Sequence, residues 1–286
     1  MTGWLVVSDV DHTLIESPDQ AVQAGACLRQ LQRRGIATLL ASSKTFSEMV
    51  ALQGEGGLPP QPFLFENGAG IGWPLDRWPP QAGAPPRLQL GAYGALVEDD
   101  GADRLAVLLR DLRAQTNLRF ELLSELSYAE IERHLGLAEP LARLALQRLA
   151  SLPLLWREGQ GDLDQLRWHL APHGLTAVPG GRLLHIARPG GKGEALERLL
   201  PWLAAEAGAT APHLLACGDS ENDRSLLERA AIALVFHPPD RPPLSLAAPH
   251  PGAVFLRRTI VAGGPEGWLE AVEAALAELE PERLMR

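Results

Sequence analysis

Residues 4–17, WLVVSDVDHTLIES, join an apolar run to two aspartates that flank one valine. Leu5, Val6 and Val7 are typical of a short buried strand, and Asp9 and Asp11 follow directly where that strand ends. Two carboxylates this close resist being ionised together. A cation between them would offset the repulsion. The stretch therefore predicts a cation site at the end of a buried strand.

The composition is that of a globular protein with a sizeable core. The chain has 286 residues, 46% of them hydrophobic and 21% charged, which allows one large domain or two small ones. It contains no apolar run of the roughly 18 residues that a membrane span needs, and no recognisable secretory signal. Only Cys27 and Cys217 are present, so no disulfide framework is expected. These features favour a cytoplasmic protein, and the net charge of −9 argues against nucleic acid as a partner.

Lysine is nearly absent. Of the 26 basic residues only Lys44 and Lys192 are lysines, and both follow apolar runs in short polar turns. A planar guanidinium is a poor substitute where a compact, mobile ammonium is needed. Both lysines are therefore candidate functional residues, although Lys44 is equally compatible with a solvated turn.

Apolar strands alternate with helices at both ends of the chain. Strands are predicted at residues 5–8, 36–42, 62–67, 213–219, 231–236 and 253–257, and helices at 18–35, 46–53, 192–208, 221–230 and 265–280. This alternation predicts a doubly wound, Rossmann-like parallel sheet covered by helices on both faces.

The middle of the chain lacks this alternation. A Pro-rich segment at 75–87 precedes it, and Gly190 and Gly191 after it suit a hinge. We expect an α+β cap domain at 85–188, inserted into an α/β core domain formed by 1–84 and 189–286.

Polar residues follow four of the predicted core strands. They are Asp9 and Asp11 after the first, Ser42, Ser43 and Lys44 after the second, Glu66 and Asn67 after the third, and Asp219, Asn222 and Asp223 after the strand at 213–219. Open α/β sheets bind ligands at the carboxyl ends of their parallel strands. The dispersed residues are thus expected to converge on one crevice.

The residue types in this crevice suit phosphate chemistry. The aspartates 9, 11, 219 and 223 form an anionic, oxygen-rich set that fits Mg²⁺, and Ser42 can donate to a phosphoryl oxygen. Lys192 opens a helix, where the macrodipole disfavours a cation; an anion held between the ammonium and the helix N-terminus would remove that cost. An aspartate in such a site can attack phosphorus.

Four ordered motifs resemble those of the haloacid dehalogenase superfamily of phosphotransferases: DVDHT at 9–13, ASSKT at 41–45, GGKGEA at 190–195 and GDSENDRSLL at 218–227. The insert between the second and third implies the large α/β cap of the sugar-phosphatase branch. SSKT, FENGAGI at 65–71 and GGRLLHI at 180–186 are similar to the mannosyl-3-phosphoglycerate phosphatase family. His12 and Gly191 depart from the usual pattern of the superfamily.

The resemblance implies a role for each motif residue. Asp9 would be the nucleophile and Asp11 the acid and base; Ser42, Ser43 and Lys192 would bind the phosphoryl group. Mg²⁺ would be held by Asp9, the backbone carbonyl of Asp11, Asp219 and Asp223, with Asn222 orienting Lys192 or Asp219 and Ser220 in support.

Simpler interpretations exist for several of these residues. Asp-x-Asp alone also caps turns or marks metal-dependent glycosyltransferases, and residues 218–225 could be a capped helix. Ser43 or Thr45 is expected to cap the helix at 46–53. Glu66, with Asn67 beside it, is as compatible with a buried acid that fixes a loop as with a sugar-binding one.

The sequence thus predicts a Mg²⁺-dependent phosphatase acting on a small phosphorylated sugar acid. By resemblance this is mannosyl- or glucosyl-3-phosphoglycerate, whose products are compatible solutes. Lys44, Glu66, Asn67 and Arg182 are candidate substrate contacts, with Arg182 binding the carboxylate or else forming a surface ion pair. The alternatives are a sucrose-phosphate phosphatase or a phosphohexomutase on the same scaffold, and a non-catalytic binding module.

Overall fold

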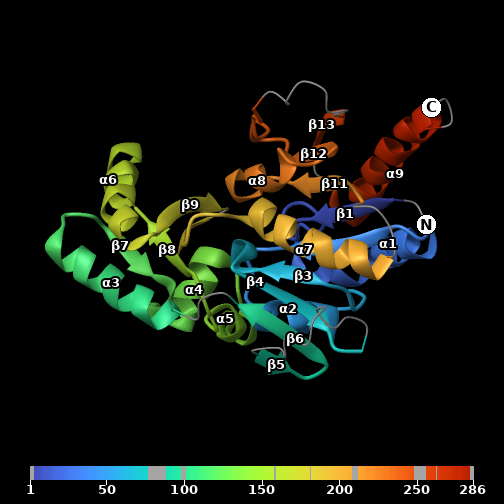
Figure 1. Cartoon of the computed structure of the whole chain (residues 1–286). Coiled ribbons are helices and arrows are strands. Elements are labelled where there is room, and N and C mark those ends of the chain that lie inside the picture. Colours follow the sequence, from blue (N-terminus) through green and yellow to red (C-terminus); the bar gives the residue numbers. More distant parts are fainter. Residues whose placement is uncertain are drawn as a thin grey trace.

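The computed structural model describes residues 3–76, 88–97, 101–157, 159–180, 182–207, 212–247, 256–261 and 263–283. Within them the chain forms two sheets, each with its own helices (Figure 1). The larger unit combines the blue and cyan N-terminal residues with the orange and red C-terminal ones, and the green to yellow insert lies at one side of it.

The large sheet has nine described strands in the order β13-β12-β11-β1-β2-β3-β4-β6-β5. Strands β13 to β3 are parallel, and β4, β6 and β5 continue the sheet in antiparallel pairing. The parallel strands are β1 (Trp4–Ser8), β2 (Ala37–Ala41), β3 (Phe63–Phe65), β11 (His213–Gly218), β12 (Ile232–His237) and β13 (Leu256–Val261). The antiparallel ones are β4 (Gly70–Pro74), β5 (Leu88–Leu90) and β6 (Tyr93–Val97).

Helices cover both faces of the parallel part of this sheet, as the sequence predicts. Val6 of β1 packs in a cluster with α1 (Ala21–Arg33), α2 (Phe46–Gln53) and α9 (Gly264–Arg283). Its neighbours Leu5 and Val7 point to the other face and pack with α7 (Lys192–Ala207) and α8 (Arg224–Leu227). Alternate side chains of one strand thus enter two cores, which explains why β1 is apolar throughout.

The insert forms an antiparallel sheet of its own, in the order β7-β8-β10-β9. Its strands are β7 (Phe120–Leu122), β8 (Leu152–Trp156), β9 (Thr176–Gly180) and β10 (Leu183–Ala187), and its helices are α3 (Ala102–Gln115), α4 (Tyr128–Leu135), α5 (Glu139–Ala145) and α6 (Gln160–Leu170). Leu109, Leu154 and Leu166 share one core between the sheet, α3 and α6. The fold is therefore a Rossmann-like core with an α+β cap.

Strand β6 extends the large sheet as far as Val97. The boundary predicted from the sequence, after residue 84, places residues 88–97 in the cap, because the short strands within them have no helix between them. We now propose that the cap begins after Val97 and ends near Ala187.

Several predicted elements differ from the observed ones in length. The third strand ends at Phe65, because a 3₁₀ turn follows it and Asn67 (φ 59°) and Gly68 (φ 91°) adopt left-handed backbone there. The helix predicted at 221–230 is a 3₁₀ turn followed by the four-residue α8. The predicted strand at 253–257 lies partly outside the described residues, and β13 continues to Val261. None of the described helices is long and apolar enough to cross a membrane.

Candidate active site

Asp9 lies at the carboxyl end of β1, between β11 and β2 in the sheet. Its backbone N–H donates to the carbonyl of Cys217 (2.9 Å), and its carbonyl accepts from Ser8 Oγ (2.7 Å). Ser8 Oγ in turn accepts from the buried indole Nε1 of Trp268 (3.0 Å). These bonds fix the backbone that presents the Asp9 carboxylate.

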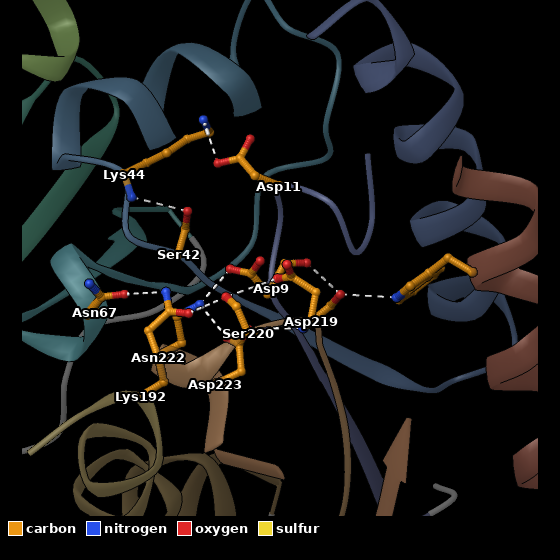
Figure 2. A network of polar contacts seen from close by, with 12 residues as sticks. Asp9, Asp11, Ser42, Lys44, Asn67, Lys192, Asp219, Ser220, Asn222 and Asp223 are labelled. Carbon is orange, nitrogen blue, oxygen red and sulfur yellow. Dashed lines mark hydrogen bonds and ion pairs between the residues drawn. The ribbon is translucent and has the colours of Figure 1, made fainter. Parts of the chain in front are cut away.

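Lys192, the first residue of α7, is completely buried beside Asp9 (Figure 2). Its Nζ lies 2.5 Å from Asp9 Oδ1 and 2.6 Å from Asp223 Oδ1. Burial lowers the pKa of this ammonium, but the charges of Asp223 and Asp9 outweigh that effect and hold the pKa above its ordinary value. Lys192 is therefore charged and bridges two of the predicted site residues.

A third carboxylate, that of Asp219, lies beside the two that bind this ammonium. Asp9, Asp219 and Asp223 each offer an oxygen within 4.8 Å of the others. Burial raises the pKa of Asp9 well above its usual value, Lys192 opposes this, and the charges of Asp223 and Asp219 add to the rise. Burial and the charge of Asp223 raise the pKa of Asp219 to about 7. When all three carboxylates are ionised, the cluster carries more negative charge than one lysine neutralises.

Asp11, the fourth predicted carboxylate, points away from this cluster and pairs with Lys44. The distance from Lys44 Nζ to Asp11 Oδ2 is 2.8 Å, and the Asp11 side chain is 42% exposed. Both lysines of the chain thus pair with aspartates of one site (Figure 2). The placement leaves the Asp11 carboxylate accessible to a ligand.

The residues present fit a divalent cation. Four carboxylates against two ammonium groups leave a formal charge of −2, which one such ion would neutralise. The three clustered side chains offer only oxygen atoms, the ligands that Mg²⁺ prefers.

The loop after β2 adds Ser42 and Ser43. Ser42 is fully buried, and its Oγ accepts from the backbone N–H of Lys44 (3.1 Å). The carbonyl of Ser43 accepts from Arg148 of the insert (2.7 Å). Thr45 caps α2 and forms a capping box with Glu48, so of the two predicted caps Thr45 is the one observed.

Asn222 hydrogen-bonds to two of the other predicted residues. Its Nδ2 donates to Asn67 Oδ1 (3.0 Å), and its Oδ1 accepts from Ser220 Oγ (2.6 Å), which also contacts Asp219 Oδ1 at 3.3 Å. Asn222 therefore reaches Asp219 through Ser220, and it shows no direct bond to Lys192.

Glu66 is buried and engaged entirely within the protein. Its carboxylate accepts from the backbone N–H groups of Leu149 (2.8 Å), Ala150 (3.0 Å) and Ser151 (2.8 Å), and from Ser151 Oγ (2.7 Å). These bonds join the core to the insert. The contacts favour the loop-fixing alternative for Glu66 over a sugar-binding role.

Replacing this carboxylate should therefore destabilise the fold. In the Glu66→Gln variant one oxygen becomes an amide that faces backbone donors, and we expect the free energy of unfolding to fall by about 3 kcal/mol, the value of a charged hydrogen bond. The control is Glu121, whose side chain is 46% exposed and pairs with Arg157. Glu121→Gln should change the free energy of unfolding by no more than about 0.5 kcal/mol. Urea denaturation measures the free energy of unfolding of both variants. Similar losses in the two would contradict the loop-fixing interpretation of Glu66.

A cleft of about 280 Å³ opens at this site between core and insert. Asp9, Asp11, Lys44 and Asp219 line its core side, and Leu123, Leu137, Arg148, Arg182 and His185 line its insert side. Arg182 is exposed, and its Nη1 donates to the carbonyl of His134 (3.3 Å).

Sequence reasoning missed Arg148, because nothing distinguishes it from the many other arginines of the chain. His185 is buried. Its Nδ1 has no hydrogen-bond partner among the described residues, and burial lowers the pKa of its ring to about 3. His185 is therefore neutral.

No protein-family model matches the sequence. The fold is similar to that of solved haloacid dehalogenase-like hydrolases. One such hydrolase from Bacteroides thetaiotaomicron is 18% identical with a TM-score of 0.58, over 94% of this chain and 98% of that one. A Bacillus subtilis hydrolase of this type is 20% identical with a TM-score of 0.54, over 80% and 88% of the two chains. A phosphatase of the haloalkanoate superfamily from B. thetaiotaomicron is 15% identical, with a TM-score of 0.57 over 94% of each chain.

Proposed function

We propose that the protein is a Mg²⁺-dependent phosphomonoesterase that forms an aspartyl phosphate. The observation that carries the proposal is the buried Lys192 held between Asp9 and Asp223, at the carboxyl end of β1. A similar fold in a phosphatase supports it. A module that only binds a ligand would not need a nucleophile, an acid and a buried cation together.

The proposed reaction has two steps on the same phosphorus atom. A carboxylate oxygen of Asp9 attacks phosphorus, the P–O bond to the substrate alcohol breaks, and Asp11 gives its proton to the leaving oxygen. Asp11 then takes a proton from water, whose oxygen attacks phosphorus and breaks the bond to Asp9. Inorganic phosphate leaves, and both aspartates return to their starting states. The exposure of Asp11 towards the cleft suits this proton transfer.

The negative phosphoryl group and the metal ion would each be held by their own set of residues. Ser42, Ser43 and Lys192 would bind phosphoryl oxygens. Asp9, Asp219, Asp223 and the carbonyl of Asp11 would hold Mg²⁺, which when bound supplies positive charge next to the phosphoryl group.

For the substrate we propose a glycosyl-3-phosphoglycerate, with mannose or glucose as the sugar. Support comes from the SSKT and FENGAGI stretches and from the cationic insert side of the cleft, where Arg148 and Arg182 lie. The test is phosphate release from an aryl phosphate, from glycosyl-3-phosphoglycerates and from sucrose 6-phosphate, with Mg²⁺ present. If the protein hydrolyses none of these compounds, the proposed phosphatase function is refuted. A preference for sucrose 6-phosphate would refute only the proposed substrate.

Removal of divalent metal should abolish activity. We expect dialysis against a chelator to stop phosphate release, Mg²⁺ to restore it and to raise the unfolding temperature, and Ca²⁺ to inhibit. Ca²⁺ accepts more ligands in looser geometry than Mg²⁺, so it can engage the Asp9 oxygen that must attack. The unfolding temperature gives a readout independent of turnover. Full activity after chelation, with no shift on adding Mg²⁺, would contradict the metal assignment.

A further inference from the structure

Arg148 follows α5 in the short connection to β8 and lines the same cleft as Asp9, Asp11 and Lys44. Its guanidinium is held by two backbone carbonyls, with Nε donating to Ala145 (2.9 Å) and Nη1 donating to Ser43 (2.7 Å). Ser43 lies between Ser42 and Lys44 in the loop after β2. One end of Arg148 is therefore fixed against the loop proposed to bind the phosphoryl group.

The residues that follow Arg148 are fixed as well. Glu66 accepts the backbone N–H groups of Leu149, Ala150 and Ser151. The side chain of Arg148 is thus fixed to the Ser43 loop, and the backbone that follows Arg148 is fixed to Glu66 after β3. A cation positioned before the ligand arrives loses little conformational freedom on binding.

Arg148 also differs from the two lysines in its charge balance. Lys44 is neutralised by Asp11, and Lys192 by Asp9 and Asp223. In the part of the chain that the structure describes, no carboxylate pairs with Arg148, and its Nη2 group has no hydrogen-bond partner. A guanidinium carries more N–H donors than its two carbonyl bonds use.

His185, whose ring lies within reach of the charge of Arg148, offers no compensating charge. The positive charge of Arg148 contributes to the lowered pKa of His185, after burial as the larger cause, so this ring is neutral. The insert side of the cleft therefore contains a fixed, uncompensated cation beside the phosphoryl-binding loop.

We propose that Arg148 is a specificity-determining residue that binds a carboxylate carried by the substrate in addition to its phosphoryl group. The inference rests on the proposed phosphatase function and assigns the substrate's carboxylate to one side chain of the insert. A planar guanidinium matches a carboxylate with two parallel hydrogen bonds. Arg182, the carboxylate partner predicted from sequence, lines the same cleft but is exposed and bonded only weakly, to His134.

Two small probes isolate the carboxylate. 3-Phosphoglycerate and glycerol 3-phosphate share a phosphorylated three-carbon skeleton and differ in a carboxylate against a hydroxymethyl group. We expect the parent to prefer 3-phosphoglycerate in kcat/KM. Arg148→Gln should lower that constant roughly 10- to 100-fold, the value of a charged hydrogen bond, and change the constant for glycerol 3-phosphate by less than about threefold. Arg148→Lys should restore part of the preference.

Arg143→Gln is the matched control. Arg143 is on α5, exposed and paired with Glu139, so its loss should leave both constants unchanged. Both values of kcat/KM are also measured for Arg182→Ala.

Several results would overturn the inference. Equal losses on both probes in Arg148→Gln would indicate a structural role. A parent that hydrolyses an aryl phosphate but shows no preference between the two probes would also contradict the inference. So would loss of the preference in Arg182→Ala alone. If the parent also fails on the aryl phosphate, it is the proposed phosphatase function that fails.

Discussion

The Asp9→Asn protein is expected to fold normally and to release phosphate at roughly a thousandth of the parent rate or less. The amide has nearly the shape of the carboxylate and keeps an oxygen near Lys192, but it has no ionised oxygen with which to attack phosphorus. Steady-state phosphate release with saturating Mg²⁺ measures the effect. Turnover within tenfold of the parent would refute the nucleophile assignment.

The stability of the same variant separates chemistry from folding. Burial, with a further contribution from the charges of Asp223 and Asp219, holds the pKa of Asp9 high, so the ionised carboxylate is unfavourable in the metal-free fold. Without metal, Asp9→Asn should therefore unfold at the same temperature as the parent or above it. The exposed Asp19 provides a control, and Asp19→Asn should alter neither rate nor unfolding temperature. A clearly lower unfolding temperature for Asp9→Asn would mean that its inactivity reflects damage to the fold.

Lys192→Met is expected to lower the free energy of unfolding by about 3–5 kcal/mol, the usual cost of breaking a buried ion pair from one side. Its ammonium is fully buried within 2.6 Å of both Asp9 and Asp223, and methionine leaves both carboxylates without that partner. Activity should be lost as well, because the phosphoryl group loses a cation. Urea denaturation and phosphate release measure the two effects.

The other lysine is the natural control for this prediction. Lys44 and Asp11 are partly exposed, and such pairs contribute about 1 kcal/mol or less to stability. Lys44→Met should therefore lower the free energy of unfolding much less than Lys192→Met. Lys192→Arg should remain badly impaired, since a guanidinium is wider than the ammonium that fits here. An active, stable Lys192→Arg protein would contradict the argument drawn from the scarcity of lysine.

The parallel core was predictable because its strands are buried on both faces. Such strands are apolar throughout, and β1, β11 and β12 stand out for that reason. That the polar residues after these strands lie together was also predictable, because parallel strands bring their carboxyl ends to one edge of the sheet. The structure brings Asp9, Lys192, Asp219 and Asp223 together there.

The contacts between core and insert could not be predicted in this way. Glu66 and the amides it binds are more than 80 residues apart in sequence, and Arg148 meets Ser43 across a similar separation. No local pattern marks such partners, because each depends on how two separately folded units dock. Strands β5 and β6 were missed because they are short and antiparallel, without helices between them.

The Glu66 contacts also bear on how the two units can move. The chain passes between the two sheets twice, after Val97 and after Ala187, and a body attached at two points can still rotate about the line between them. The bonds from Glu66 to residues 149–151 add a third point of attachment. Wide separation then has to break these bonds and expose their amide protons to solvent. Solvent exchange at these three amides would therefore report how often the core and the insert separate.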